Sequence, residues 1–263
     1  VGNDNIGGST RFPYLTQTGG GGSYGFGLNG AGVATVTEAL LGVQNLTWER
    51  SHKTDIGLEV GIQSKLNIIA DYFAERRTNI LIQRQTISTI AGYGSSPNVF
   101  ANLGEAKNTG FDGTVEYNDQ FGKVGLRLFG NVTYAANKIV FNDEPPRQYA
   151  YQKAAGHMYG EYQGWISQGL FTSQDDINNS PVQKFGTVAP GDIKYKDLSG
   201  DGQIDANDWT YLGKSTFPKW MYGTGFTVSY HGFDLSTLFQ GIADVGIMAN
   251  GSRIPAYMGA IGA

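Results

Sequence analysis

The chain has 263 residues, with 39 glycines, 15 tyrosines, 14 phenylalanines, 16% charged residues and no cysteine, and its formal net charge is −4. This composition is unlike that of a helical protein, and a hydrophobic content of 40% at low net charge excludes a disordered chain. A disulfide scaffold and a cysteine-based metal site are also excluded, and the acidic balance without a basic run excludes a nucleic-acid partner.

Membrane insertion through helices is excluded as well, because no stretch reaches about 18 consecutive apolar residues. A transmembrane β-barrel is compatible with the sequence, since its strands alternate apolar and polar residues and leave no hydropathy plateau. The start at Val1 shows neither a methionine nor a signal-peptide pattern, so we expect a piece of a longer precursor.

Alternation with a period of two is the main pattern along the chain, and it predicts strands. The first clear example is 55–62, where Ile56, Leu58 and Val60 alternate with Asp55, Gly57 and Glu59. The pattern recurs at 66–75, 111–118, 123–134, 222–230 and 233–240. These predicted strands are long for a soluble sheet and suit a tilted membrane crossing.

The connections between the predicted strands fall into two classes. Tight turns are expected at 63–65, 119–122 and 231–232, whereas roughly 84–106 and 139–218 are long segments. Short turns on one rim and long loops on the other are typical of outer-membrane barrels. A soluble β-sandwich also has alternating strands, but its loops need not sort by length, and loops beyond about 15 residues are uncommon there.

Four regions follow from this pattern. We expect an extracellular loop segment at 1–44, four barrel strands with one long outer loop at 45–139, a large extracellular excursion at 140–218, and two further strands with a following loop at 219–263. The strand that ends near Ile139 leaves the short-turn rim, so any spanning strands before Lys219 must come in an even number. The predicted fold class is therefore all-β, a part of a transmembrane antiparallel barrel with about six spanning strands. Because a closed barrel needs at least eight, the chain forms part of a larger wall.

The two faces of these strands are expected to differ. Aliphatic side chains should face lipid, and their charged alternates should face a wet interior, because a charge on the lipid face costs about 2 to 4 kcal/mol at the midplane. The first set is Ile56, Leu58, Val60, Leu126, Leu128, Val132, Phe226, Val228, Leu235 and Phe239, and the second is Glu59, Asp71, Glu116 and Arg127. Aromatic residues near strand ends fit an interfacial girdle: Trp48, Tyr72, Tyr117, Tyr134, Trp220 and Tyr222.

One acidic segment has the spacing of a twelve-residue calcium loop. The expected ligands at positions 1, 3, 5, 7, 9 and 12 are Asp197, Ser199, Asp201, the carbonyl of Gln203, Asp205 and Asp208. Gly202 at position 6 permits the sharp turn, and Ile204 at position 8 can anchor the loop in apolar surroundings. Aspartate in place of glutamate at position 12 makes a bidentate grip less assured, and helical flanks are missing.

Ca²⁺ is therefore the predicted cofactor, in a structural and not a catalytic role, because no nucleophile or second carboxylate pair accompanies the loop. The alternative is a solvated acidic turn in which Asp-Gly and Ser-Gly pairs only shape the backbone. His52, His157 and His231 are far apart in the sequence and more consistent with solvent-facing residues than with a catalytic site. No catalytic residue is predicted, and we expect no enzyme.

Several segments resemble the C-terminal barrel portion of the SusC/RagA-type TonB-linked outer-membrane transporters. They are Asn45–Glu49, Asp55–Leu58, Asp71–Phe73, Asn108–Gly113, Gly160–Phe171 and, most specifically, Pro190 to Gly223. The opening residues 1–6 also resemble a loop of that family. The TonB-box, the plug domain and a terminal aromatic strand have no counterpart in the sequence.

The resemblance implies a bacterial outer-membrane barrel of 22 strands with an internal plug, which imports oligosaccharides or peptides with energy from TonB. It also implies a SusD-like surface lipoprotein that lids the extracellular opening, in addition to the lipid bilayer as surroundings. Substrate-contacting residues are not carried over; Tyr93, Phe100, Tyr149, Tyr151 and Trp165 can stack on sugars, pack the loops or face the lipoprotein.

Two other classes of function stay open at this point. One is a passive porin or an adhesin barrel, which would have no plug and no TonB-box in the full-length protein. The other is a soluble calcium-dependent carbohydrate-binding module or hydrolase, in which a second sheet would cover the apolar strand faces.

Overall fold

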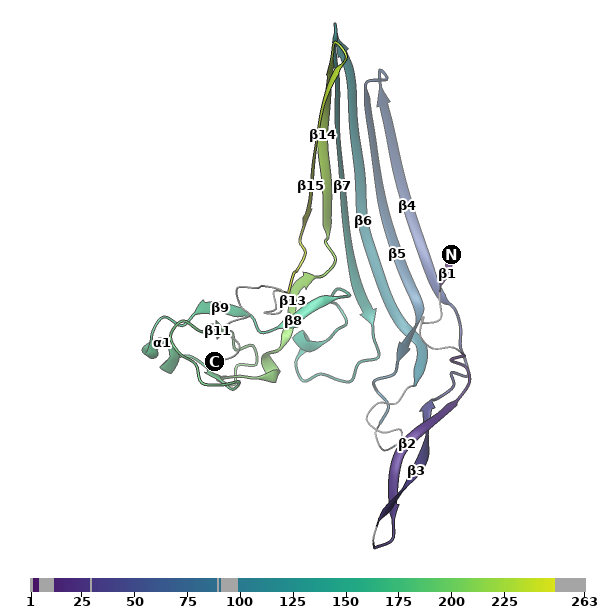
Figure 1. The fold of residues 1–263 in the computed structure, drawn as a ribbon, viewed down its shortest axis with the longest axis vertical. Helices are drawn as coiled ribbons and strands as arrows, with labels where there is room; N and C mark the ends of the chain where they lie inside the picture. The colour runs from purple at the N-terminus through teal and green to yellow at the C-terminus, as the bar shows by residue number, and fades with distance from the viewer. Residues whose placement is uncertain (1, 5–11, 29, 89, 91–98, 249–263) are drawn as a thin grey trace. The chain divides into compact units, whose positions relative to one another are not determined.

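A computed structural model describes residues 2–4, 12–28, 30–88, 90 and 99–248 (Figure 1). Strands dominate, and helices are short. The strands are β1 (Gly2–Asp4), β2 (Gln17–Phe26), β3 (Ala31–Leu40), β4 (Glu49–Ile62), β5 (Leu66–Gln83), β6 (Phe100–Phe121), β7 (Val124–Phe141), β8 (Glu161–Gly164), β9 (Ser167–Leu170), β10 (Val182–Gln183), β11 (Ile193–Tyr195), β12 (Gln203–Ile204), β13 (Thr210–Ser215), β14 (Trp220–Tyr230) and β15 (Phe233–Ala243). Short helices with described bounds are α1 (Gln174–Asn178) and the 3-10 turns Ala150–Gln152 and Ala206–Asp208. Within the described ranges, no helix has the length and apolarity needed to cross a membrane.

The main sheet contains the six long strands that the sequence predicts. Its order is β1-β4-β5-β6-β7-β14-β15, and β4, β5, β6 and β7 are 14, 18, 22 and 18 residues long (Figure 1). The sheet is not closed on itself in this part of the chain, since β1 and β15 are its two edges. The predicted all-β class and the assignment to a part of a barrel wall are confirmed.

The parity argument for the region 140–218 is also confirmed. β7 pairs directly with β14 in antiparallel register from Trp220 opposite Tyr134 to Tyr230 opposite Val124. No strand from the intervening residues is inserted between these two strands. The eighty-residue segment is thus an excursion from one rim of the sheet, as expected.

The predicted tight turns join neighbouring long strands, but the one expected at 119–122 lies further along the chain, at Gly122 and Lys123, because β6 continues to Phe121. Gln63 and Ser64 between β4 and β5 have φ of +51° and +56°, and His231 and Gly232 between β14 and β15 have φ of +49° and +85°. Positive φ at both central residues matches the twist of a tight hairpin. His231 is exposed at this turn, as predicted.

The first region differs from the expected loop segment. Gly2 to Asp4 pair with Ser51 to Glu49, so β1 extends the main sheet at the β4 edge. Residues 17–40 form a separate antiparallel hairpin, β2 with β3, which is interrupted by a bulge between Gly20 and Ser23. Neither element was predicted, and in β2 four consecutive glycines hide any alternation.

The chain divides into two compact units, each with parts of several long strands. One comprises Val1–Gly57, Asp71–Gly110 and Ala136–His157, and the other Leu58–Ala70, Phe111–Ala135 and Met158–Ala263. The second unit includes the small sheets of the excursion, in which β8 pairs with β13, β9 with β11 and β10 with β12. Phe171 and Ile204 are buried among these small sheets and form the apolar core of this part of the excursion.

The predicted separation of charged from aliphatic side chains is observed on the strands of the second unit. Arg127 donates from Nε to Oε1 of Glu116 at 2.7 Å, and Thr227 lies opposite Arg127 in the register. The alternate positions pair Leu128 with Phe226, on the other face. Those two side chains line one concavity together with Val115, Tyr117 and Phe239.

The same separation holds in the first unit at Asp71. A Cβ atom placed on Gly57 would meet the carboxylate of Asp71, so these two positions share a face. Ile56, which precedes Gly57 on β4, therefore points to the opposite face. Of the predicted aromatic girdle, Tyr134 and Trp220 pack together with ring centroids 4.7 Å apart, and Phe111 joins them at 5.8 and 5.7 Å.

Candidate functional site

The acidic loop after β11 folds around its first carboxylate. Asp197 accepts through Oδ1 from the amide of Gly200 (2.6 Å) and the hydroxyl of Ser199 (3.2 Å). Its Oδ2 accepts from the amide of Gly202 at 2.9 Å. Gly200 and Gly202 have φ of +77° and +82°, in the left-handed region that glycine adopts without a Cβ penalty. The sharp turn expected at Gly202 is therefore present.

Asp208 is fully buried and holds the loop from within. Its Oδ1 accepts from the amides of Leu198 (2.8 Å) and Ser199 (2.9 Å), and its Oδ2 accepts from the amide of Asp205 (3.0 Å). Burial by itself raises the pKa of the Asp208 carboxyl, but the three amide hydrogen bonds outweigh burial and hold its pKa below the ordinary value. The two ends of the loop are thus tied together by one side chain.

The remaining predicted ligands shape the second half of the loop. Asp201 accepts through Oδ1 from the amide of Gln203 at 2.9 Å, and its side chain is exposed. Asp205 accepts through Oδ1 from the amide of Asn207 at 2.7 Å and caps the 3-10 turn Ala206–Asp208. Each of these two carboxylates uses one oxygen in these bonds.

The oxygen donors of this loop are of the kind that calcium prefers, but they are not gathered around one point. Among the residues that the structure describes, no group of three or more His, Asp or Glu side chains is arranged to hold a metal ion. Oδ1 of Asp208 already accepts two hydrogen bonds, which fill its lone pairs, so a bidentate grip at position 12 does not fit this arrangement. Calcium binding by Asp197, Ser199, Asp201, Gln203, Asp205 and Asp208 stays a prediction.

An aromatic cluster fixes the loop to the rest of the excursion. Trp165 donates from Nε1 to the carbonyl oxygen of Asp205 at 2.7 Å. Its ring packs at 4.4 Å from Trp209 and at 4.5 Å from Phe185, measured between centroids. Ile204 is completely buried, which confirms its predicted role as an anchor. The position of the acidic loop therefore depends on the packing of the aromatic cluster around Trp165.

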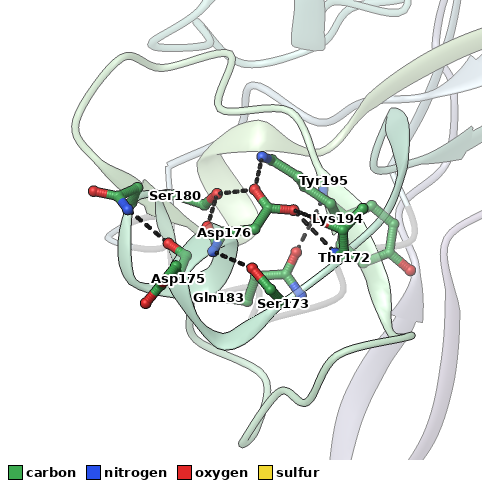
Figure 2. A network of polar contacts seen from close by, with 9 residues as sticks. Thr172, Ser173, Asp175, Asp176, Ser180, Gln183, Lys194 and Tyr195 are labelled. Carbon is green, nitrogen blue, oxygen red and sulfur yellow. Dashed lines mark hydrogen bonds and ion pairs between the residues drawn. The ribbon is translucent and has the colours of Figure 1, made fainter.

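A second polar centre, which sequence reasoning missed, surrounds Asp176 in α1. Its carboxylate accepts from Lys194 Nζ at 2.7 Å and from the amide of Thr172 at 3.1 Å, while Ser173 caps the helix through the amide of Asp176 (Figure 2). The hydrogen bond from Lys194 is the main cause that holds the pKa of Asp176 below its ordinary value. The Ser-x-x-Asp spacing is a helix-start pattern that could have indicated α1.

The base of the excursion is tied down by two consecutive carboxylates that follow β7. Asp143, nearly buried, accepts from Nε of Arg84 (2.6 Å), the amide of Gln85 (3.1 Å) and the hydroxyl of Thr86 (3.0 Å). Burial raises the pKa of Asp143, but hydrogen bonds from Arg84, Thr86 and Gln85 outweigh it and lower the pKa. Next to it, Glu144 accepts from the amides of 154 and 155 at 2.8 and 3.0 Å. No local sequence pattern marks these contacts.

The loop aromatics considered for substrate contact belong to different elements of the chain. Tyr149 and Tyr151 stack with centroids 5.2 Å apart, and Trp165 belongs to the cluster beside the acidic loop. Phe100 begins β6, and Tyr93 lies outside the described residues.

Comparison with known proteins places this arrangement in a family. A family model described as TonB dependent receptor-like, beta-barrel, matches residues 5–258. Two curated proteins of Formosa agariphila align with the chain. TonB-dependent receptor P3 is 24% identical over 213 residues, which cover 74% of this chain and 20% of P3. TonB-dependent receptor P26 is 29% identical over 212 residues, which cover 75% of this chain and 20% of P26.

Solved structures share the fold. The RagAB peptide transporter matches 89% of this chain and 24% of its own at a TM-score of 0.62 and 16% identity. The RagAB peptide importer in its open-open state matches the same shares at a TM-score of 0.63 and 15% identity. The chain spans about a fifth of the length of the curated relatives. The chain belongs to the TonB-dependent receptor-like β-barrel family, whose members are outer-membrane proteins.

Proposed function

We propose that the protein containing this chain imports nutrient oligomers, oligosaccharides or peptides, across the bacterial outer membrane with energy supplied through TonB. The observation that carries this proposal is that the two faces of the long strands differ, one being aliphatic and the other carrying charged side chains. Ile56, Leu58 and Leu235 are 65%, 64% and 62% exposed on one face. In a soluble sandwich a second sheet would cover such side chains, whereas in a barrel wall lipid covers them.

Family membership and the relatives' names support active import over passive diffusion. The curated relatives are called TonB-dependent receptors, and the solved structures are of a peptide importer. Because the names describe receptors and transporters, we propose that this protein catalyses no covalent reaction. A passive porin or adhesin is the alternative within the same fold.

We further propose that the excursion at 140–218 presents a surface to a SusD-like lipoprotein that lids the opening. The folded core of residues 158–218 supports this proposal, because Ile204, Phe171 and the Asp176 centre make this part of the excursion a preformed body. Ca²⁺ is proposed as a structural ion of the acidic loop, with Asp208 supplying at most one oxygen. The oxygen-rich sequence from Asp197 to Asp208 supports calcium, and the amide bonds of Asp208 limit its share.

The experiment uses the full-length gene in its own bacterium. A deletion strain complemented with the wild-type gene is given defined oligosaccharides or oligopeptides, and uptake is measured with and without a functional TonB. We expect uptake of one of the two classes to be lost in the deletion strain and in the TonB-deficient strain. Uptake that continues at the same rate without TonB indicates a passive porin and overturns active import.

A second measurement addresses the lipoprotein. The tagged full-length protein is purified from membranes in mild detergent, and co-purifying lipoproteins are identified. Expected is one surface lipoprotein in about equal amount, which is lost when 140–218 is replaced by a short turn while the barrel still assembles. Retention of the lipoprotein by that variant would contradict the proposed role of the excursion.

A further inference from the structure

Charged side chains occur on the aliphatic face of the sheet toward its long-loop end. Arg76 donates from Nε to Oε1 of Glu105 at 2.6 Å, which puts both side chains on one face of β5 and β6. Their neighbours belong to the other face, where Arg77 contacts Glu75 at 2.7 Å and Glu49 at 3.0 Å. Adjacent strand residues point to opposite faces, so Arg76 shares its face with Ile68 and Tyr72.

Three more basic residues belong to the face of Arg76. Arg50 lies between Glu49 and Ser51, and Ser51 donates to Glu75 at 2.6 Å on the other face. Lys107 is two residues beyond Glu105 on β6, and Lys138 is four residues beyond Tyr134 on β7. Residues an even number of positions apart on a strand share a face, so Lys107 lies on the face of Glu105 and Lys138 on the face of Tyr134. All four basic residues are exposed, and all four lie in the same compact unit. We call Arg50, Arg76, Lys107 and Lys138 the outer basic patch.

Three members of the patch follow an aromatic residue at a constant distance. Going toward the long-loop end, Arg76 comes four residues after Tyr72 on β5, Lys107 four residues from Phe111 on β6, and Lys138 four residues after Tyr134 on β7. Four strand residues span about 13 Å, or roughly 9 Å along the membrane normal for a strand tilted by about 45°. Aromatic belts sit at the level of the headgroups. The patch therefore lies in the headgroup region, on the outer side of the aromatic residues.

The patch carries more positive charge than it can neutralise. Glu105 is its acidic partner and binds Arg76, with Nη2 and Oε1 also 2.6 Å apart. Among the described residues, Arg50, Lys107 and Lys138 are in no ion pair. On the opposite face of the same strands the basic side chain of Arg77 is instead shared by two glutamates. Exposed cations at headgroup depth attract anionic lipid groups.

We propose that the outer basic patch binds the phosphate groups of a phosphorylated glycolipid in the outer leaflet. Charge complementarity supports this occupant, because four cations face one carboxylate at the depth where lipid phosphates lie. The constant spacing from the aromatics matches a molecule whose acyl chains cover the aliphatic face while its headgroup reaches the patch. The inference rests on the outer-membrane location and not on which oligomer is imported.

The test uses the full-length protein in lipid nanodiscs. Retention of a diphosphorylated glycolipid of the lipid A type, and of its dephosphorylated form, is measured by native mass spectrometry. The patch variant is Arg76→Gln with Lys107→Gln and Lys138→Gln. The control, matched in the charge removed, is Lys53→Gln on the other face of β4, Lys123→Gln at a short turn and Lys184→Gln in the excursion. Heat-modifiable electrophoretic mobility verifies that each barrel is folded.

We expect the patch variant to bind the phosphorylated glycolipid about a hundredfold more weakly, since each of the three basic residues contributes about fivefold. The control should change affinity less than twofold. Charge-preserving replacements, Arg76→Lys, Lys107→Arg and Lys138→Arg, should restore binding and keep the inference testable if the glutamine variant misfolds.

Three outcomes overturn the inference. One is an equal loss of binding in the patch and control variants, and another is equal retention of the phosphorylated and dephosphorylated glycolipids. The third is competition by millimolar inorganic phosphate as strong as that by the glycolipid, because it would mean that the patch recognises free phosphate and not a membrane lipid.

Discussion

Arg84 and Asp143 form an ion pair, Nε to Oδ2 at 2.6 Å, which joins the segment after β5 to the segment after β7. Asp143 has a φ of +40°, a left-handed backbone that asparagine and aspartate tolerate better than other side chains. The backbone and the side chain of one residue thus hold the base of two outer segments together.

Replacement of Asp143 by asparagine should weaken this connection without straining the backbone. The charge-assisted hydrogen bonds to Arg84 and to the amide of Gln85 are lost or weakened, at a cost of about 1 to 3 kcal/mol. Hydrogen exchange at the Gln85 amide should accelerate, whereas the exposed control Arg147→Gln should leave it unchanged. Unchanged exchange at Gln85 in the Asp143 variant would mean that other contacts hold this segment.

Acidification should loosen the acidic loop through Asp208. The folded pKa of this carboxyl lies below its unfolded value of about 3.9, so its stabilisation is complete above that value and is lost as the pH falls through the folded pKa. After correction for intrinsic rates, exchange of the Leu198 and Ser199 amides should rise below about pH 4. Asp208→Asn should exchange quickly at neutral pH and show no further rise, while Asp201→Asn should behave like the wild type.

The membrane-spanning part of the fold was predictable because its physical constraint is local. Burial of alternate side chains in lipid imposes a period of two, and it is visible at Ile56, Leu58 and Val60 without any knowledge of tertiary structure. The loop lengths then fixed the strand order, which the direct pairing of Trp220 with Tyr134 confirms. β2 was missed because Gly19 to Gly22 have no side chains that could alternate.

The polar centres of the outer segments were predictable only where the residues that interact are close together in the sequence. The turn around Asp197 depends on Gly200 and Gly202, a few residues away, and was expected. Asp176 depends on Lys194, 18 residues away, and Arg84 on Asp143, 59 residues away. Such pairs form only after the chain has folded, so a single sequence contains no periodic signal for them.

Close packing at Gly225 should make β14 sensitive to a single methyl group. A Cβ atom there would contact the carbonyl oxygen of Thr237 and lie 2.6 Å from Cζ of Phe129. Gly225→Ala should destabilise the folded barrel by about 1 to 3 kcal/mol, as overpacking does. The control is Gly61→Ala in β4, where nothing lies within 4 Å of the added atom. Equal urea midpoints for the two variants would show that β14 shifts to accommodate the methyl group.

Removal of the Asp176 carboxylate should loosen α1 and β11 together. Asp176→Ala leaves Lys194 and Thr172 without their shared acceptor, so exchange at the Thr172 amide should increase. Asp175→Ala removes a neighbouring acid from the same helix and serves as the matched control. A similar increase in both variants would indicate that helix propensity, and not the Lys194 contact, is responsible.

Calcium binding to the acidic loop is best tested at Asp201, because this side chain is exposed and makes one hydrogen bond within the loop. Asp208→Asn would disturb the loop with or without a metal, since the Asp205 amide loses its acceptor and the hydrogen bonds from Leu198 and Ser199 lose their charge assistance. If the loop binds calcium, the full-length protein should become more resistant to heat as calcium rises toward the millimolar range that is typical of extracellular sites. Asp201→Ala should abolish most of this calcium-dependent gain and leave stability in chelator nearly unchanged. Asp175→Ala, which removes an equal charge outside the loop, should retain the gain.

A wild-type protein that takes up no calcium at several millimolar in calorimetric titration would identify the segment as a solvated turn held by Asp197 and Asp208 alone.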